Sequence, residues 1–161
     1  MTNQDFKLSD LLKRLEHGKL PVDVFNQVAR LTVTPVVEIV PFFTKDEVEK
    51  VLLFQRTSED TLWPNMFYIP GTIILSTDEP GTLDDSLNRV INGKLSGIEI
   101  TDLKFVNIKL IKSVRGMELA LVYSARIINL MDKSNLYDVN KLPDNMIEGH
   151  KDFILMAKLK E

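Results

Sequence analysis

The sequence predicts an α/β protein in which a mixed β-sheet is flanked by helices and preceded by a helical hairpin. Two observations support this fold class. The hydrophobic pattern changes near Thr32 from helical spacing to strand-like runs, and strands and helices alternate from there on. The chain has 161 residues, of which 44% are hydrophobic and 27% charged, which suits one globular core. We expect the hairpin over residues 1–31 and the α/β domain over residues 32–161.

Two short helices are expected in the first 31 residues. Ser9 can cap the first helix, Gly18 suits its C-terminal end, and Pro21 suits the first turn of the second helix. His17 is expected near the end of the first helix, where it can meet free carbonyl groups. The apolar residues of the two helices recur at three- and four-residue spacing: Leu11, Leu12 and Leu15, then Val24, Phe25, Val28 and Leu31. Such a hairpin packs against its own domain or joins two copies of the chain.

The middle of the chain predicts a β-hairpin followed by a helix. Residues 34–43 and 48–54 are rich in β-branched and aromatic residues, and the polar residues 44–47 between them suit a turn. Residues 81–95 have the clearest helical pattern. Their apolar side chains fall on one face: Leu83, Leu87, Val90, Ile91 and Leu95.

The last third of the chain predicts a second β-hairpin and a final helix. Residues 104–114 and 117–128 read as long strands, and the Arg-Gly pair at 115–116 suits a tight turn between them. A helix over residues 144–158 is expected after the Leu-Pro pair at 142–143. The element order therefore favours a mixed sheet with helices packed on it.

Composition excludes several classes of function. The chain carries 20 basic and 23 acidic residues, a net charge of −3, which argues against DNA or RNA binding through bulk positive charge. It has no cysteine, which excludes disulfides, thiol catalysis and cysteine-bound metals. Its first residues are polar, and no apolar run approaches the length of a membrane span. We expect a cytoplasmic protein without a membrane partner.

Several segments resemble the Nudix hydrolase family in their order and spacing. They are Leu-Leu-Phe-Gln-Arg at 52–56, Phe-Tyr-Ile-Pro-Gly at 67–71, Thr-Leu-Asp-Asp-Ser-Leu-Asn-Arg at 82–89, Gly-Ile at 97–98 and Leu-Pro at 142–143. The resemblance covers residues 34–159 and implies a mixed sheet sandwiched between helices. It also implies a cleft for nucleoside diphosphate derivatives, which family members hydrolyse with magnesium held by the glutamates of a loop–helix–loop box.

The box is degenerate in this sequence. At the family's metal-binding glutamate positions, the chain has Gly81, Val90, Gly93 and Lys94. Magnesium needs oxygen ligands, and the ammonium group of Lys94 would repel the ion. We therefore expect no catalytic residue, no metal ligand and no cofactor. The expected function is binding of a nucleotide-like or phosphorylated small molecule with little or no hydrolysis.

Three residues are candidates for ligand binding. Arg56 ends the strand that the resemblance directs toward the cleft, and its guanidinium suits phosphate, although it could instead pair with Glu59 or Asp60. Lys94 could contact phosphate as a point charge. Trp63, next to a proline, suits a rim position where it packs on a base or sugar.

Two other functions remain open. An unconventional hydrolase could hold magnesium through acids outside the box, drawn from Asp78, Glu79, Asp84, Asp85, Glu118 and Glu148. A protein-interaction module could dimerise through the N-terminal helices.

Arg89 is expected to pair with Asp85 in the same helix, and His150 is expected to be structural or exposed.

Overall fold

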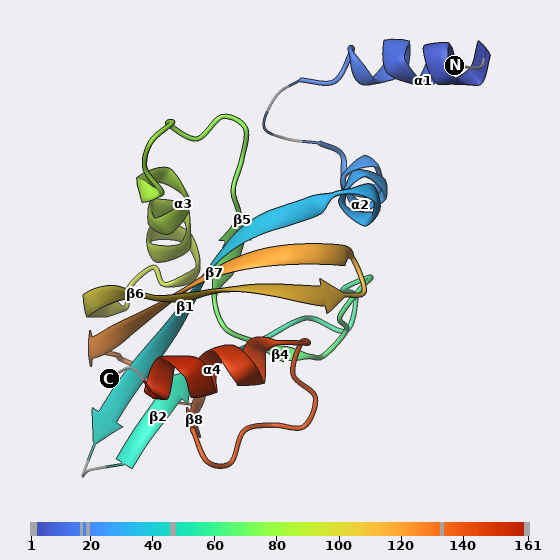
Figure 1. Ribbon diagram of the computed structural model, residues 1–161. Coiled ribbons are helices and arrows are strands. Elements are labelled where there is room, and N and C mark those ends of the chain that lie inside the picture. The colour runs from blue at the N-terminus through green and yellow to red at the C-terminus, as the bar shows by residue number, and fades with distance from the viewer. Residues whose placement is uncertain (1–2, 17, 19, 46–47, 133, 160–161) are drawn as a thin grey trace.

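The computed structural model describes residues 3–16, 18, 20–45, 48–132 and 134–159. Figure 1 shows a twisted mixed sheet with helices packed on it, as the sequence predicts. His17 and residues 46–47 of the expected turn lie outside the described residues, but Lys45 pairs with Val48, so the hairpin forms. Within the described ranges, no helix is both long and apolar enough to cross a membrane.

The main sheet has the strand order β6-β7-β1-β2-β8, and β5 pairs with β1 at one end. The central contact is parallel, between β1 and β7, with Glu38 opposite Val122. The other pairings in this sheet are antiparallel, and β3 and β4 form a separate small ribbon. The strand bounds are β1 Val33–Lys45, β2 Val48–Leu52, β3 Phe54–Gln55, β4 Phe67–Tyr68, β5 Gly71–Ile73, β6 Glu99–Ser113, β7 Gly116–Asn129 and β8 Leu136–Asp138.

Two hydrophobic clusters cover the two faces of the sheet. On one face, α4 (His150–Lys158) packs Phe153 and Ile154 against alternate residues of β1, including Val36 and Val40. On the other face, Val90 and Leu95 join the second cluster with residues such as Ile39, whose side chain points the opposite way because strand residues alternate. The sheet is therefore sandwiched between helices.

The helix expected over residues 81–95 has two parts. An α-helix, α3 (Asp84–Arg89), continues into a single π-helical turn, η1 (Val90–Lys94). Four of the five residues on the predicted buried face, Leu87, Val90, Ile91 and Leu95, join one hydrophobic cluster. The predicted start was wrong: Leu83 is the N-cap of α3, and the backbone N–H of Asp84 donates to the hydroxyl of Thr82 ahead of the first turn.

The final helix also begins later than predicted. Residues 144–149 run as a loop in which Met146 makes a parallel bridge to Phe67, and Gly149, with φ of 81°, precedes the helix. Strand β8 was missed because three residues give too short a pattern.

Both N-terminal helices form, but a packed hairpin is not evident. Helix α1 (Asn3–Leu12) lies apart from α2 (Val22–Leu31) in Figure 1, and its Leu8 and Leu11 are each 58% exposed. Ser9 lies inside α1 rather than at its N-cap, which corrects the prediction. Helix α2 packs closely on the sheet: a Cβ on Gly116 would lie 2.5 Å from the carbonyl oxygen of Ala29.

Candidate functional site

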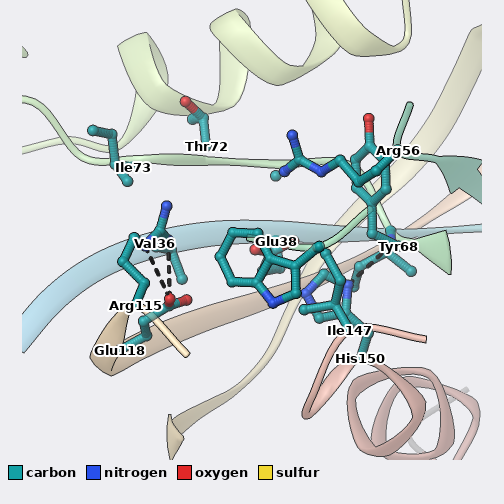
Figure 2. Close-up of a pocket in the computed structure, with 13 residues that line it drawn as sticks. Val36, Glu38, Arg56, Tyr68, Thr72, Ile73, Arg115, Glu118, Ile147 and His150 are labelled. Carbon is teal, nitrogen blue, oxygen red and sulfur yellow. Dashed lines mark hydrogen bonds and ion pairs between the residues drawn. The ribbon is translucent and has the colours of Figure 1, made fainter. Parts of the chain in front are cut away.

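A small polar pocket lies on the α4 face of the sheet, where β1, β5, the β6–β7 turn and the start of α4 meet (Figure 2). Its volume is about 70 Å³, several times the roughly 10–15 Å³ that one water molecule needs on the same measure, which is room for a phosphate-sized group. The pocket is lined by Val36, Glu38, Arg56, Trp63, Tyr68, Ile69, Gly71, Thr72, Ile73, Arg115, Glu118, Ile147 and His150.

Glu38 lies at the back of the pocket, on the central strand β1. The residue is only 8% exposed, and its Oε2 has no hydrogen-bond partner among the residues that the structure describes. Burial, reinforced by the charge of Glu118, raises the pKa of Glu38 to about 8. The side chain is therefore a neutral carboxylic acid at pH 7.

Glycine at position 71 makes room for this carboxyl group. Gly71 pairs with Glu38 across β1 and β5, and a Cβ at this position would overlap both carboxyl oxygens. Gly71 thus has a specific steric role here: it lets the backbone of β5 close directly over the Glu38 side chain.

Arg56 follows β3 and lies against two aromatic rings. Its guanidinium carbon lies 4.4 Å from the Tyr68 ring centroid and 5.8 Å from that of Trp63. The Nη1 of Arg56 lies 3.5 Å from Oδ2 of Asp60, which is a loose ion pair. Its Nε is buried and has no partner within the described part of the chain, which leaves one donor unsatisfied.

Arg115 enters the pocket from the tight turn between β6 and β7. Its Nη2 forms an ion pair of 3.0 Å with Glu118, which also accepts a hydrogen bond from the hydroxyl of Ser113. The guanidinium lies 5.3 Å from the ring centroids of both Trp63 and Phe25 of α2. Figure 2 shows Arg115 and Arg56 on opposite sides of the pocket.

His150, the first residue of α4, is buried and lines the pocket. Its Nδ1 accepts a hydrogen bond of 3.1 Å from the backbone N–H of Ile69. Burial and, to a smaller extent, the charge of Arg56 lower the pKa of His150 to about 3. The ring is neutral at physiological pH, and the expectation of a structural histidine agrees with these contacts.

Of the three predicted ligand residues, two line this pocket. Arg56 does so, and it also makes the predicted alternative pair with Asp60. Trp63 forms a wall rather than an exposed rim, because it is 5% exposed and its Nε1 donates to Glu148 at 3.3 Å. Lys94 lies outside the described residues that line the pocket, and its Nζ donates to the Tyr68 hydroxyl at 3.3 Å.

Arg89 does not pair with Asp85 as the sequence predicted. Its two terminal nitrogens bind the carboxylate of Asp78, and one of them also donates to the carbonyl of Ile73. These bonds, above all, hold the pKa of Asp78 well below its usual range. Asp85 instead accepts a backbone hydrogen bond from Glu79.

At the positions where the resemblance implies metal-binding glutamates, the chain has no carboxylate to offer magnesium. The side chain of Val90 is fully buried in the hydrophobic cluster beneath α3, Gly93 offers no side chain, and Lys94 presents a cation. Across the described residues, no three side chains of the metal-binding types gather closely enough to hold an ion. Four of the six alternative acids are engaged elsewhere: Asp78, Asp85, Glu118 and Glu148.

Sequence reasoning missed Glu38 and the pocket role of Arg115. Glu38 carried a readable signal, since it is the one acid in the apolar run Val-Val-Glu-Ile-Val at 36–40. Arg115 carried none, because a basic residue in a tight turn is ordinarily solvent-exposed.

Comparison of the sequence with protein-family models gave no match, and neither did comparison with curated proteins. Solved structures do match. The Nudix domain of Shewanella oneidensis NrtR, complexed with ADP ribose, aligns with a TM-score of 0.59 at 18% identity over 99% of both chains. A mutT/nudix family protein from Listeria innocua aligns at 0.61 and 14% identity over 80% of this chain and 94% of that one.

The NrtR structure complexed with a 27mer DNA aligns with a TM-score of 0.56 at 23% identity, over 78% of this chain. This chain spans only 60% of that one, and 63% of the chain in a further NrtR structure. Together with the sheet order and the sandwiching helices, these likenesses show that the protein has the Nudix fold.

Proposed function

We propose that this protein binds a nucleotide-like or phosphorylated small molecule in the polar pocket, with little or no hydrolysis. The observation that carries the proposal is the pair of buried polar atoms left without partners among the described residues, Glu38 Oε2 and Arg56 Nε, which belong to one pocket. Buried polar groups are nearly always satisfied, so an unsatisfied pair in a cavity marks a place for a ligand.

The pocket size suggests how such a ligand lies. About 70 Å³ admits one phosphate-sized group between Arg56 and Arg115, while the rest of the molecule extends outward. Guanidinium groups suit phosphate because their donors match its oxygens in pairs. Trp63 packs on the inserted part of the ligand, and Lys94, exposed beside Tyr68, meets a phosphate nearer the solvent.

Weak or absent hydrolysis is supported by the side chains at positions 81, 90, 93 and 94, none of which is an acid. The competing hydrolase would need at least two of the alternative acids to turn toward one ion. For Glu118 this would break its contacts with Arg115 and Ser113.

The NrtR domain bound to ADP ribose makes that molecule the first ligand to test. Calorimetric titration with ADP-ribose, with magnesium or with chelator, should give binding that is independent of the metal. Arg56→Ala and Arg115→Ala should each weaken binding at least tenfold, whereas Arg14→Ala, an exposed arginine outside the pocket lining, should not. Equal binding by all variants, or robust turnover that chelator abolishes, would reject the proposal.

A second candidate is a homodimer formed through the N-terminal helices, which the exposed Leu8 and Leu11 of α1 favour. Light scattering on the whole chain and on a chain lacking residues 1–11 would test it. A fall from dimer to monomer mass on deletion supports this candidate, and an unchanged mass removes it.

A further inference from the structure

We propose that Glu38 is a specificity-determining residue of the pocket, whose carboxyl group, in its neutral form, donates a hydrogen bond to an oxyanion held beside Arg56. This inference rests on the proposed function and deepens it, since it names the chemical class of the inserted group. That group is an acceptor without protons of its own, such as an ionised phosphate.

Geometry directs the Glu38 carboxyl group to the ligand. Glu38 lies on β1 between Val36 and Val40, which face the α4 side of the sheet. The backbone of β5 at Gly71 closes over its carboxyl group and limits its movement. Glu38 lines the pocket, and its Oε2 is buried and without a partner among the described residues.

The surrounding charges come from every element packed around Glu38. Arg56 and Arg115 approach from two sides, and their positive charges, with that of Lys94 in η1, favour the ionised form. Glu118 on β7 opposes it, and so does burial, which outweighs the others. His150 on α4 is neutral, and Tyr68 on β4 lies under the Arg56 guanidinium. The acid therefore keeps its proton at neutral pH, and the pocket presents donors from both Glu38 and Arg56.

This arrangement separates two classes of ligand group. An ionised phosphate oxygen can accept from Arg56 Nε–H and from the Glu38 O–H together. A sugar hydroxyl aimed at Glu38 would instead be bound best by the ionised carboxylate, which accepts its proton. The two cases predict opposite effects of pH, because deprotonation of Glu38 turns an attractive donor into a charge that repels phosphate.

The test measures ADP-ribose affinity by calorimetry from pH 6.5 to 9.5, a range in which the ligand itself does not titrate. The wild-type affinity should be constant up to about pH 7 and fall by roughly tenfold or more by pH 9.5. Glu38→Gln, which keeps the shape and a donor, should bind within about threefold of wild type at pH 7 and lose most of the pH dependence. Glu99→Gln, an exposed acid on β6, should behave as wild type.

The outcomes separate this inference from the proposed function. Binding that is flat with pH, or stronger at high pH, would overturn the inference alone. A more than tenfold loss in Glu38→Gln would then show that Glu38 acts as a carboxylate. An absence of binding at every pH would overturn the proposed function and the inference with it. The wild-type profile needs no variant, so the test does not depend on the folding of Glu38→Gln.

Discussion

At the scale of single residues, Glu38 is an acid in the middle of a buried strand. Its neighbours Val37 and Ile39 are both fully buried, and its own carboxyl group is kept neutral by its surroundings. A charged group at such a position is costly unless it is needed, and replacement by an apolar residue would suit the core better. The sequence shows this anomaly, but nothing in it indicates that residues 56, 71 and 115 gather around the same carboxyl group.

The first prediction concerns stability against pH. Because the folded-state pKa of Glu38 lies above the unfolded value, the unfolded chain gives up the proton first as pH rises. The contribution of protonated Glu38 to the free energy of unfolding is complete below about pH 4.5, and it is lost as the pH rises to about 8. Glu38→Gln should therefore gain stability over wild type between pH 5 and pH 8, by up to about 4 kcal/mol.

Urea unfolding of both proteins at several pH values measures this difference. A stability difference that stays constant from pH 5 to pH 8 would show that Glu38 ionises normally in the folded protein.

The second prediction concerns the glycine opposite Glu38. Gly71→Ala should destabilise the fold by about 1–3 kcal/mol, because the new methyl group overlaps the buried carboxyl group. Gly93→Ala is the matched control: nothing lies within 4 Å of its Cβ, and alanine should be neutral or slightly stabilising. Thermal unfolding of the two variants compares them.

The same steric cause can be checked with a double variant. In the Glu38→Ala background, Gly71→Ala should lose most of its cost, because the overlapping atoms are gone. A cost that is unchanged in that background would place the strain elsewhere.

At the scale of elements, apolar spacing predicted the buried face of residues 81–95 but not the loop before it. Leu87, Val90, Ile91 and Leu95 pack in the cluster beneath α3, as the periodicity indicates. The partner of Arg89 was predicted wrongly, because Asp78 lies eleven residues away and only the folded loop brings it close. The buried face of a helix can be read from apolar spacing, whereas the ion-pair partner of Arg89 cannot, because a loop outside the helix supplies it.

The third prediction tests the clamp formed by the ion pair of Asp78 with Arg89. Asp78→Asn should cost roughly 1–2 kcal/mol at pH 7, because it weakens the bonds to Arg89, which is partly exposed to solvent. The folded-state pKa of Asp78 is depressed, so its contribution is complete above about pH 4 and is lost as pH falls further.

Chemical unfolding at pH 7 and pH 3 gives the comparison. The difference in the free energy of unfolding between wild type and Asp78→Asn should narrow at the lower pH. Asp84→Asn, which changes an exposed acid in the helix of Arg89, should differ little from wild type. A gap that widens on acidification would contradict the clamp.

At the scale of the whole molecule, the order of strands and helices was predicted from hydrophobic periodicity, and the Nudix fold from the order of its segments. The pocket could not be predicted from the sequence, because it forms only when β1 pairs in parallel with β7 and α4 packs on the face of the sheet that carries Glu38. Its lining residues span positions 36 to 150, and no local pattern links them.

The fourth prediction concerns the N-terminal helices. Deleting residues 1–11 should change the free energy of unfolding by less than about 1 kcal/mol, because Leu8 and Leu11 bury little surface. Deleting residues 1–31 should cost several times more, since α2 buries Ala29 and places Phe25 on Arg115. Thermal unfolding compares the two deletions, and an equal loss in both would show that α1 packs on the domain.

The most direct measurement is ³¹P NMR of ADP-ribose mixed with stoichiometric protein and magnesium. A pocket with arginines and a neutral acid, on a helix without metal-binding glutamates, should shift and broaden the diphosphate signals while the ligand stays intact over hours. Appearance of phosphomonoester signals that chelator prevents would mean that the protein is a metal-dependent hydrolase after all.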